Sequence, residues 1–289
     1  MEIKWIETFI VAAKNENFRK AAEELYLTQP AVTKHIQRLE ERLQVDLFIR
    51  EGKSIRLSAA GHKYLPHAKA MLAEYENGLA AFASWKQGYH QKLTIAAAPQ
   101  IASSILPSIL NDFMNQFPEI EVLINVVNSY EVLNEVQVGN ADVGLTRIYS
   151  PHMNMECEVV FQEPVVLVAP YQIKEDNESD ILLKYRLITH NHPVYWDDLL
   201  IDINRHYEVT KTFKVNQIEV TKRFIEQGLG VSYLPHSMVK KELQQQAMKM
   251  VTPDKIALPV SQTYLCTKVK TNEVEVFIHF FKKELERFL

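Results

Sequence analysis

Residues 18–43 read FRKAAEELYLTQPAVTKHIQRLEERL, and this stretch predicts two short helices joined by a tight turn. Asn17 and Thr28 are suited to begin the two helices, because their side-chain oxygens accept hydrogen bonds from unpaired first-turn amides. Pro30 falls in the first turn of the second helix, where its missing amide hydrogen costs nothing. Both helices repeat apolar residues at helical spacing. The stretch therefore predicts a helix-turn-helix.

The second helix of this pair has the charge pattern of a DNA-recognition helix. No acidic residue lies between Thr28 and Leu39, so its exposed side chains are neutral or basic and do not repel phosphates. The neighbouring acids lie on the preceding helix or a turn further on. A three-helix bundle without any DNA contact would show the same spacing, so both interpretations stay open on this stretch alone.

A basic hairpin follows the helix-turn-helix. Residues 47–58 read LFIREGKSIRLS, in which two short apolar runs flank EGKS and predict a hairpin that presents Arg50, Lys53 and Arg56. Basic hairpins beside a helix-turn-helix follow phosphates or enter the minor groove. This predicted wing favours DNA binding over a bare helical bundle.

One long helix is predicted next. From Ser58, a suitable N-cap, apolar residues recur at spacings of three and four until about Gly88, although Pro66 requires the first turns to tolerate a kink. An apolar seam of this length needs a partner, most simply the same helix of a second subunit. The alternative is that the helix packs on its own domain.

The remaining two thirds of the chain predict α/β structure. The strand LTIAAAP, a helix over 100–117, the strand EVLINVVN, a helix over 130–138 and the strand ADVGLT alternate as in a parallel sheet covered by helices. The strands PVVLVAP, RLITH and KTFKVN and the helix VTKRFIEQGLG predict a second α/β unit. A strand and an amphipathic helix end the chain.

Candidate ligand-binding residues lie where strands end and helices begin, because small ligands bind there in open α/β sheets. Ser129 is better suited to be only a helix cap, and Arg147 is equally suited to pair with a carboxylate or to lie exposed at a strand end. The candidates are Gln100, Ser103, Ser104, Asn128, Ser129, Arg147, Thr189 and Gln217. In addition, THNHPVYW (189–196) predicts a polar loop near the cleft; His190 and His192 lack a third metal ligand in pattern.

Composition excludes several classes of protein. The 289 residues exceed one typical domain, the net charge is -4, and residues 1–60 hold ten Lys and Arg against nine Asp and Glu, so DNA contact requires charges separated by geometry. No bilayer-length apolar run or cleavable signal is present, and we expect a cytoplasmic protein. Cys157 and Cys266 form no C-x-x-C pair and are expected to be reduced and buried, with a redox switch as the alternative.

Enzyme motifs are missing from the sequence. It contains no G-x-G-x-x-G, phosphate loop, G-x-S-x-G or H-E-x-x-H, so we expect no catalytic activity and no cofactor. A two-lobed carrier module and an α/β enzyme remain as alternative classes.

Together these features resemble the LysR-type transcriptional regulators. The first part follows that family's pattern of A-A-x-x-L, S/T-Q-P-A-V-S/T, L-E, L-F-x-R and L-T/S-x-x-G, and ILPSILNDFMNQFPEIEV, VGNADVGL and QGLGVSYLP resemble weaker signatures of its effector domain. The matching residues of the first part are Ala21, Ala22, Leu25, Thr28, Gln29, Pro30, Ala31, Val32, Thr33, Leu39, Glu40, Leu47, Phe48, Arg50, Leu57, Ser58 and Gly61. Gln44 replaces the family's usual glycine, so we expect a rebuilt turn before the wing.

The resemblance implies an α/β multidomain fold. It comprises a winged helix-turn-helix (1–58), a dimerising linker helix and hinge (59–90) and a two-lobed α/β effector domain like periplasmic binding proteins (91–289). Lobe I would span about 91–162 and 267–289, and lobe II about 163–266.

The resemblance also implies partners and contacts. Double-stranded DNA carrying an interrupted palindrome, a second copy in a homodimer or homotetramer, RNA polymerase and a small effector of unknown identity, such as a carboxylate, are the expected partners; no membrane is expected. By position, the residues that would contact DNA are Thr28, Gln29, Pro30, Ala31, Thr33, Lys34 and Arg38, with Arg50 and Lys53 on the wing.

Overall fold

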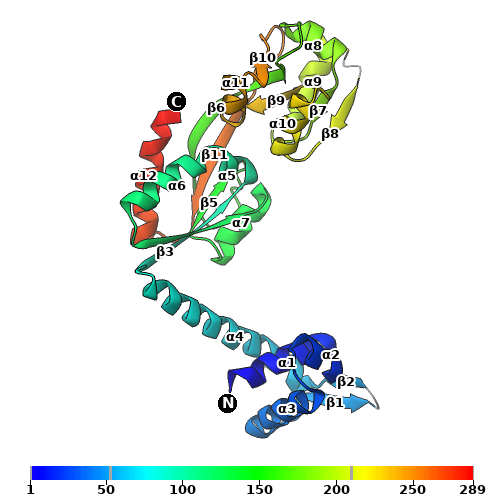
Figure 1. Cartoon of the computed structure of the whole chain (residues 1–289), viewed down its shortest axis with the longest axis vertical. Helices are drawn as coiled ribbons and strands as arrows, with labels where there is room; N and C mark the ends of the chain where they lie inside the picture. The colour runs from blue at the N-terminus through cyan, green and yellow to red at the C-terminus, as the bar shows by residue number, and fades with distance from the viewer. Residues whose placement is uncertain (1, 52–53, 209–210, 289) are drawn as a thin grey trace. The chain divides into compact units, whose positions relative to one another are not determined.

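The computed structural model describes residues 2–51, 54–208 and 211–288. The chain forms two compact units, Met1–Gly88 and Tyr89–Leu289 (Figure 1). Within the described ranges no helix is both long and apolar enough to cross a membrane.

The first unit begins with the predicted helix-turn-helix. Helices α1 (Ile3–Asn15), α2 (Phe18–Glu24) and α3 (Gln29–Leu43) pack around a core that includes Phe9 and Leu39. The Asn17 side chain accepts hydrogen bonds from the first-turn amides of α2, and Thr28 Oγ1 accepts one from the amide of Ala31 at 3.3 Å. The predicted caps therefore begin both helices, and the helix-turn-helix is confirmed.

The wing consists of strands β1 (Phe48–Glu51) and β2 (Ser54–Leu57), paired antiparallel. Glu40 Oε1 joins it to α3 by accepting hydrogen bonds from the amides of Leu47 at 2.8 Å and Phe48 at 3.2 Å. Gln44 ends α3 in the left-handed conformation at φ 54°. The expectation of a rebuilt turn is therefore wrong: the glutamine itself adopts the conformation that favours glycine, and its Nε2 donates to the carbonyl of Glu41 at 2.6 Å.

Helix α4 (Ala59–Lys86) is the predicted linker helix, and the Ser58 hydroxyl caps it. The helix continues through Pro66, and its first turns pack on the core of the helix-turn-helix. Its later apolar residues remain 47–58% exposed; they are Tyr75, Leu79, Phe82 and Trp85. The alternative that the whole helix packs on its own domain is therefore wrong for its C-terminal half.

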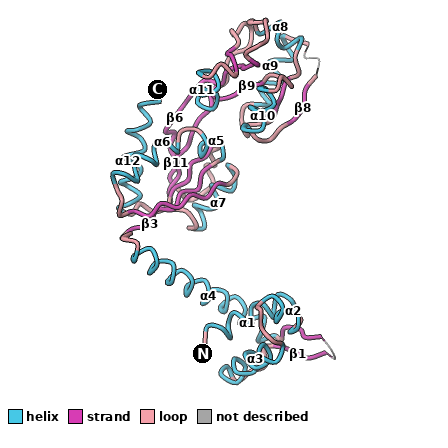
Figure 2. The backbone as a smooth tube through the Cα atoms, viewed as in Figure 1, coloured by secondary structure: helices cyan, strands magenta, loops and turns pink. Residues whose placement is uncertain are grey.

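In the second unit, one core lies around parallel strands. Strand β3 (Gln91–Ala97) pairs with β4 (Ile120–Val126) and β5 (Val143–Thr146), while β11 (Val260–Thr267) runs antiparallel between β5 and β6 (Glu156–Pro170). The helices of this part are α5 (Pro99–Ser103), α6 (Leu106–Gln116), α7 (Ser129–Val138) and α12 (Asn272–Leu285), followed by the short helix η1 (Glu286–Phe288). We call the part around Leu93, Phe113 and Phe277 lobe I. Figure 2 shows its strands with helices α6, α7 and α12 around them.

A second pair of cores lies further along β6. The end of β6 pairs with β9 (Ser232–Pro235) and β10 (Met248–Met250), and β7 (Leu187–Thr189) pairs with β8 (Thr212–Lys214) in a small parallel sheet. The helices are α8 (Glu178–Lys184), α9 (Trp196–His206), α10 (Ile218–Glu226) and α11 (His236–Gln244). We call this part, around Val165 and Val166, lobe II. The sheet continues from lobe I into lobe II along β6.

Two expectations for this unit are corrected. The helix expected over 100–117 is two helices, because the backbone leaves helical geometry at Ser104. Cys157 and Cys266 are joined by a disulfide of 2.08 Å, so the expectation of reduced thiols is wrong. The antiparallel register of β6 and β11 places these residues directly opposite one another, which their distance in sequence did not reveal.

Candidate functional site

The structure brings the predicted DNA-contact residues of the helix-turn-helix to one surface of α3. Thr28, Gln29, Pro30, Lys34 and Arg38 are exposed, while Ala31 and Thr33 are partly exposed. Positions 29 and 33 are four residues apart and therefore lie on the same face of the helix. The same spacing places positions 30, 34 and 38 together. Of the wing residues, Lys53 lies outside the described part of the chain, and only the backbone of Arg50 is described, in β1.

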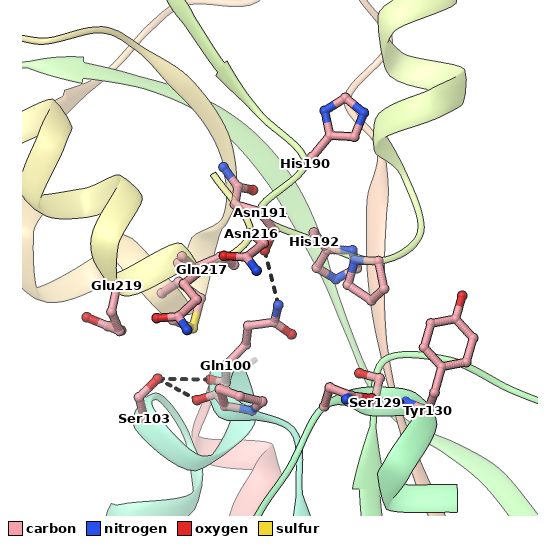
Figure 3. Close-up of a pocket in the computed structure, with 15 residues that line it drawn as sticks. Gln100, Ser103, Ser129, Tyr130, His190, Asn191, His192, Asn216, Gln217 and Glu219 are labelled. Atoms are coloured by element: carbon pink, nitrogen blue, oxygen red, sulfur yellow. Dashed lines mark hydrogen bonds between the residues drawn. The ribbon is translucent and has the colours of Figure 1, made fainter. Parts of the chain in front are cut away.

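A cavity of about 320 Å³ lies between lobes I and II (Figure 3). The helix N-termini of α5 and α7 approach it from lobe I, and the loop before α9 and the N-terminus of α10 from lobe II. Five predicted ligand residues line it: Gln100, Ser103, Asn128, Ser129 and Gln217. The other polar residues lining it are Tyr130, His190, Asn191, His192, Asn216 and Glu219.

Three predicted ligand residues do not line this cavity. The Ser104 hydroxyl donates to the carbonyl of Gln100 at 2.6 Å, and the buried Thr189 hydroxyl donates to the carbonyl of Phe213 at 3.4 Å. Each of these two hydroxyls therefore bonds to a backbone carbonyl of its own lobe. Arg147 is only 1% exposed, so the alternative of an exposed strand-end arginine is wrong.

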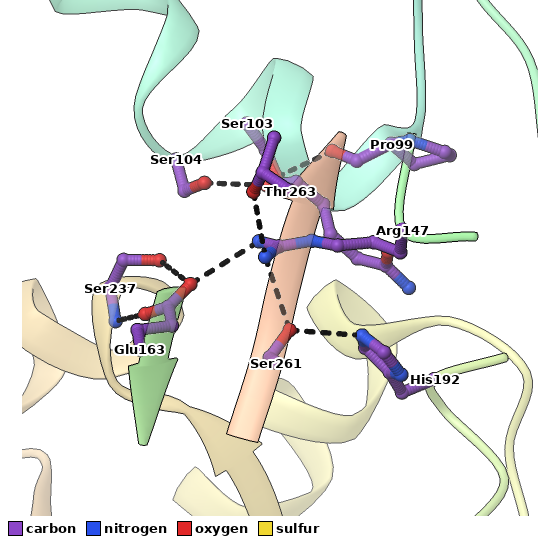
Figure 4. Close-up of polar contacts among 10 residues, drawn as sticks. Pro99, Ser103, Ser104, Arg147, Glu163, His192, Ser237, Ser261 and Thr263 are labelled. Atoms are coloured by element: carbon purple, nitrogen blue, oxygen red, sulfur yellow. Dashed lines mark hydrogen bonds and ion pairs between the residues drawn. The ribbon is translucent and has the colours of Figure 1, made fainter. Parts of the chain in front are cut away.

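Arg147 forms a buried network next to the strands that connect the lobes (Figure 4). Its Nη2 lies 3.3 Å from Glu163 Oε1 on β6, and its Nη1 donates to Ser261 and Thr263 on β11 at 3.1 and 3.0 Å. Glu163 also accepts hydrogen bonds from the amide and hydroxyl of Ser237 at the start of α11, at 2.6 and 2.9 Å. The positive charge of Arg147 is therefore already balanced by a protein carboxylate.

His192 connects this network to the cavity. The amide of Val194 donates to its Nδ1 at 3.2 Å, which places the ring proton on Nε2 for donation to Ser261 Oγ at 3.1 Å. Burial, with a smaller contribution from the charge of Arg147, holds the pKa of His192 well below its ordinary value. The imidazole is therefore neutral at pH 7.

This histidine makes stability depend on pH. The unfolded chain binds a proton at His192 below its ordinary pKa of about 6.5, whereas the folded protein does not until a lower pH. The contribution of His192 to stability is therefore fully present above pH 6.5 and falls by up to about 1.4 kcal/mol per pH unit as the pH drops toward the folded pKa. Urea unfolding between pH 7.5 and 5.5 should show a weaker acid dependence for His192→Asn. An exposed control, His152→Asn, should keep the wild-type slope; equal slopes in His192→Asn and wild type would contradict this assignment.

The arrangement suits a small polar ligand and shows no metal site. Among the described residues, no group of three or more His, Cys, Asp or Glu side chains is placed to hold a metal ion. The ring of His190 instead stacks on Trp196 with a centroid distance of 6.4 Å. No lysine or arginine is among the described residues that line the cavity, and the lining carboxylate of Glu219 is paired with Lys222 at 3.1 Å. A ligand would therefore meet mainly neutral side chains and the helix N-termini.

The fold and the two surfaces define a class of protein, a DNA-binding regulator with a separate ligand-binding domain. Comparisons with known proteins agree. Residues 3–62 match the family described as "Bacterial regulatory helix-turn-helix protein, lysR family", and residues 86–286 match "LysR substrate binding domain". The chain belongs to the LysR family of transcriptional regulators, and it is a DNA-binding transcriptional regulator with an effector-binding domain, not an enzyme.

Individual relatives are similar over nearly their whole length. "HTH-type transcriptional regulator CitR" of Bacillus subtilis is 41% identical, over 97% of this chain and 98% of its own. An uncharacterised regulator of the same organism, YxjO, is 37% identical over 96% of each chain. Solved structures of Vibrio fischeri DarR in complex with DNA and of full-length CbnR with its target DNA share the fold. Their TM-scores are 0.68 and 0.67, at 20% and 21% identity; each covers 98% of this chain, and 99% and 100% of the respective solved chain.

Proposed function

We propose that this regulator reads an interrupted palindrome with α3 and that a small carboxylate bound between lobes I and II changes its affinity for that operator. The observation that carries the effector role is the cavity lined by residues of both lobes. Across it, Nε2 of Gln100 in lobe I donates to the carbonyl of Asn191 in lobe II at 3.2 Å. A ligand here contacts both lobes at once.

Binding of such a ligand would affect the DNA-binding unit through the arrangement of the two lobes. A molecule that touches both lobes binds one arrangement of them more tightly than another, so it shifts the population toward that arrangement. In a homodimer or homotetramer, a changed arrangement of the effector domains changes the separation of the recognition helices and therefore the half-sites engaged. RNA polymerase is the further partner through which this change would reach transcription.

Self-association is proposed through α4. Its exposed apolar residues recur at spacings of three and four, and the rings of Phe82 and Trp85 stack with a centroid distance of 5.7 Å. A seam of this kind matches the packing of paired helices. We keep the proposed limits of 1–58, 59–90 and 91–289 for the three parts, with lobe I at about 91–162 and 267–289 and lobe II at about 163–266.

The helix N-termini that face the cavity are the reason for proposing a carboxylate as the ligand. The side chain of Gln217, at the start of α10, makes no capping hydrogen bond, so first-turn amides of this helix are not capped by it. First-turn amides and the helix dipole favour an anion, and the carboxylate of Glu219 in the same turn is paired with Lys222 at 3.1 Å. A carboxylate is one of the small anions that bind at a helix N-terminus.

The test is recovery of genomic DNA fragments by the purified protein across a salt series, with the upstream region of its own gene included. Enrichment of an interrupted palindrome supports the proposal, and a shift in that enrichment upon adding a carboxylate supports the effector role. If no sequence is enriched over random fragments, with or without candidate carboxylates, operator recognition by α3 is rejected.

Gln29→Ala tests base reading by α3. Gln29 is exposed at the first position of the recognition helix, and a glutamine amide can bond adenine at two positions in the major groove. We expect specific binding to lose about 1–3 kcal/mol while binding to random DNA remains near wild type. Fluorescence anisotropy on both DNAs measures the ratio. Gln87→Ala, an exposed glutamine outside α3, is the control; equal losses on both DNAs by Gln29→Ala would contradict base reading.

A further inference from the structure

We infer that the ligand of the interlobe cavity carries a hydroxyl group beside its carboxylate, so that it belongs to the hydroxycarboxylates. The inference rests on the proposed function, because it names the chemistry of the same site. Its basis is one polar atom of Gln100.

The Gln100 amide has a fixed orientation. Its Nε2 donates to the backbone carbonyl of Asn191 at 3.2 Å, and a carbonyl oxygen only accepts, so the nitrogen and oxygen of this side chain cannot be exchanged. Oε1 is then the amide atom that has no hydrogen-bond donor among the described residues. It is buried and has no hydrogen-bond partner among the described residues, although Gln100 lines the cavity (Figure 3). A buried acceptor without a donor is costly, and a ligand that supplies one removes that cost.

Three donors that line the cavity are already in use. The Ser103 hydroxyl donates to the carbonyl of Pro99 at 2.8 Å, and Nδ2 of Asn191 donates to Ser232 Oγ at 2.9 Å. The proton on Nε2 of His192 faces Ser261. Each of these three groups would have to give up a bond that it now makes in order to donate to Oε1 of Gln100. A hydroxyl of a ligand in the cavity supplies the missing donor without that loss.

Acceptor and anion sites lie in different lobes. Gln100 belongs to α5 in lobe I, whereas the first turn of α10 belongs to lobe II. A molecule with a hydroxyl at one end and a carboxylate at the other therefore bridges the cleft. The volume of about 320 Å³ is at the lower end of the roughly 300–1,000 Å³ usual for ligand cavities, so the molecule is small.

Matched ligand pairs test the hydroxyl. Calorimetric titration of the full-length protein would compare L-malate with succinate and citrate with tricarballylate, pairs that differ only in one hydroxyl. We expect the hydroxylated member of at least one pair to bind about 5- to 150-fold more tightly than its partner. Equal binding within both pairs, or no binding of any of the four, would overturn the inference.

Gln100→Met tests whether Oε1 of Gln100 causes the preference for the hydroxylated ligand. Methionine has similar length without the amide, so both the bond to Asn191 and the acceptor are lost. Loss of the Asn191 bond affects both members of a pair alike, whereas loss of the acceptor affects only the hydroxylated member. The affinity ratio should therefore fall to about 1. Gln116→Met, outside this cavity, should keep the wild-type ratio, and thermal unfolding confirms that each variant is folded.

The ligand test is independent of DNA. A retained ratio in Gln100→Met would reject the hydroxyl assignment while leaving operator binding and its modulation to be judged by fragment recovery. Conversely, failure to enrich any operator would reject the proposed regulation while leaving a measured hydroxyl preference intact.

Discussion

Arg147→Met is expected to lower the free energy of unfolding of the second unit by about 3–5 kcal/mol. The substitution removes the guanidinium but leaves Glu163, which is 5% exposed, as a buried carboxylate without its ion partner. Ser261 and Thr263 also lose the donor that they now share. Chemical denaturation at pH 7 measures the loss.

An exposed ion pair provides the control for this prediction. Lys282 Nζ lies 2.7 Å from Glu158, with both side chains substantially exposed, so Lys282→Met should cost no more than about 1 kcal/mol. Adding Glu163→Gln to Arg147→Met should restore part of the lost stability, because no buried charge then remains. A loss for Arg147→Met as small as that for Lys282→Met would show that the buried pair does not hold this region together.

The second large effect concerns α4. Phe82→Glu combined with Trp85→Glu is expected to weaken operator binding about 100-fold or more, because charges on the apolar seam prevent two chains from engaging two half-sites together. In an assembled dimer, binding of one subunit to its half-site holds the second subunit at a high effective concentration near the other half-site. Dissociation of the dimer removes this gain, which explains the size of the loss. Analytical ultracentrifugation should show a lower oligomeric state, and anisotropy with a complete operator should show the weakened affinity.

The opposite side of the same helix provides the control. Asn77→Glu with Ala80→Glu adds the same two charges about half a turn away from the seam, as helical spacing requires. These changes should leave the oligomeric state unchanged and affinity within about threefold. If the seam variant remains assembled and binds as tightly as this control, α4 is not the surface through which the chains associate.

The sequence was most informative where the signals are local. Thr28 as a cap, Pro30 in the first turn and the apolar spacing of α3 all lie within one segment, and each acts on the conformation of its immediate neighbours. The positions of Gln100, Ser129 and Gln217, which line the cavity, could be predicted for a similar reason, since helices that begin after strands can be recognised along the chain.

Where the sequence failed, the partners come from distant segments. Arg147 was recognised at a strand end, but its carboxylate partner Glu163 lies on another strand, and no local pattern pairs them. The same is true of the disulfide between Cys157 and Cys266, which depends on the register of two antiparallel strands. Local hydrogen bonds and apolar periodicity were therefore sufficient to predict the helix-turn-helix, the long helix and the α/β class. Strand register and the approach of the two lobes decided the buried ion pair and the shape of the cavity, because these depend on contacts between residues far apart in the chain.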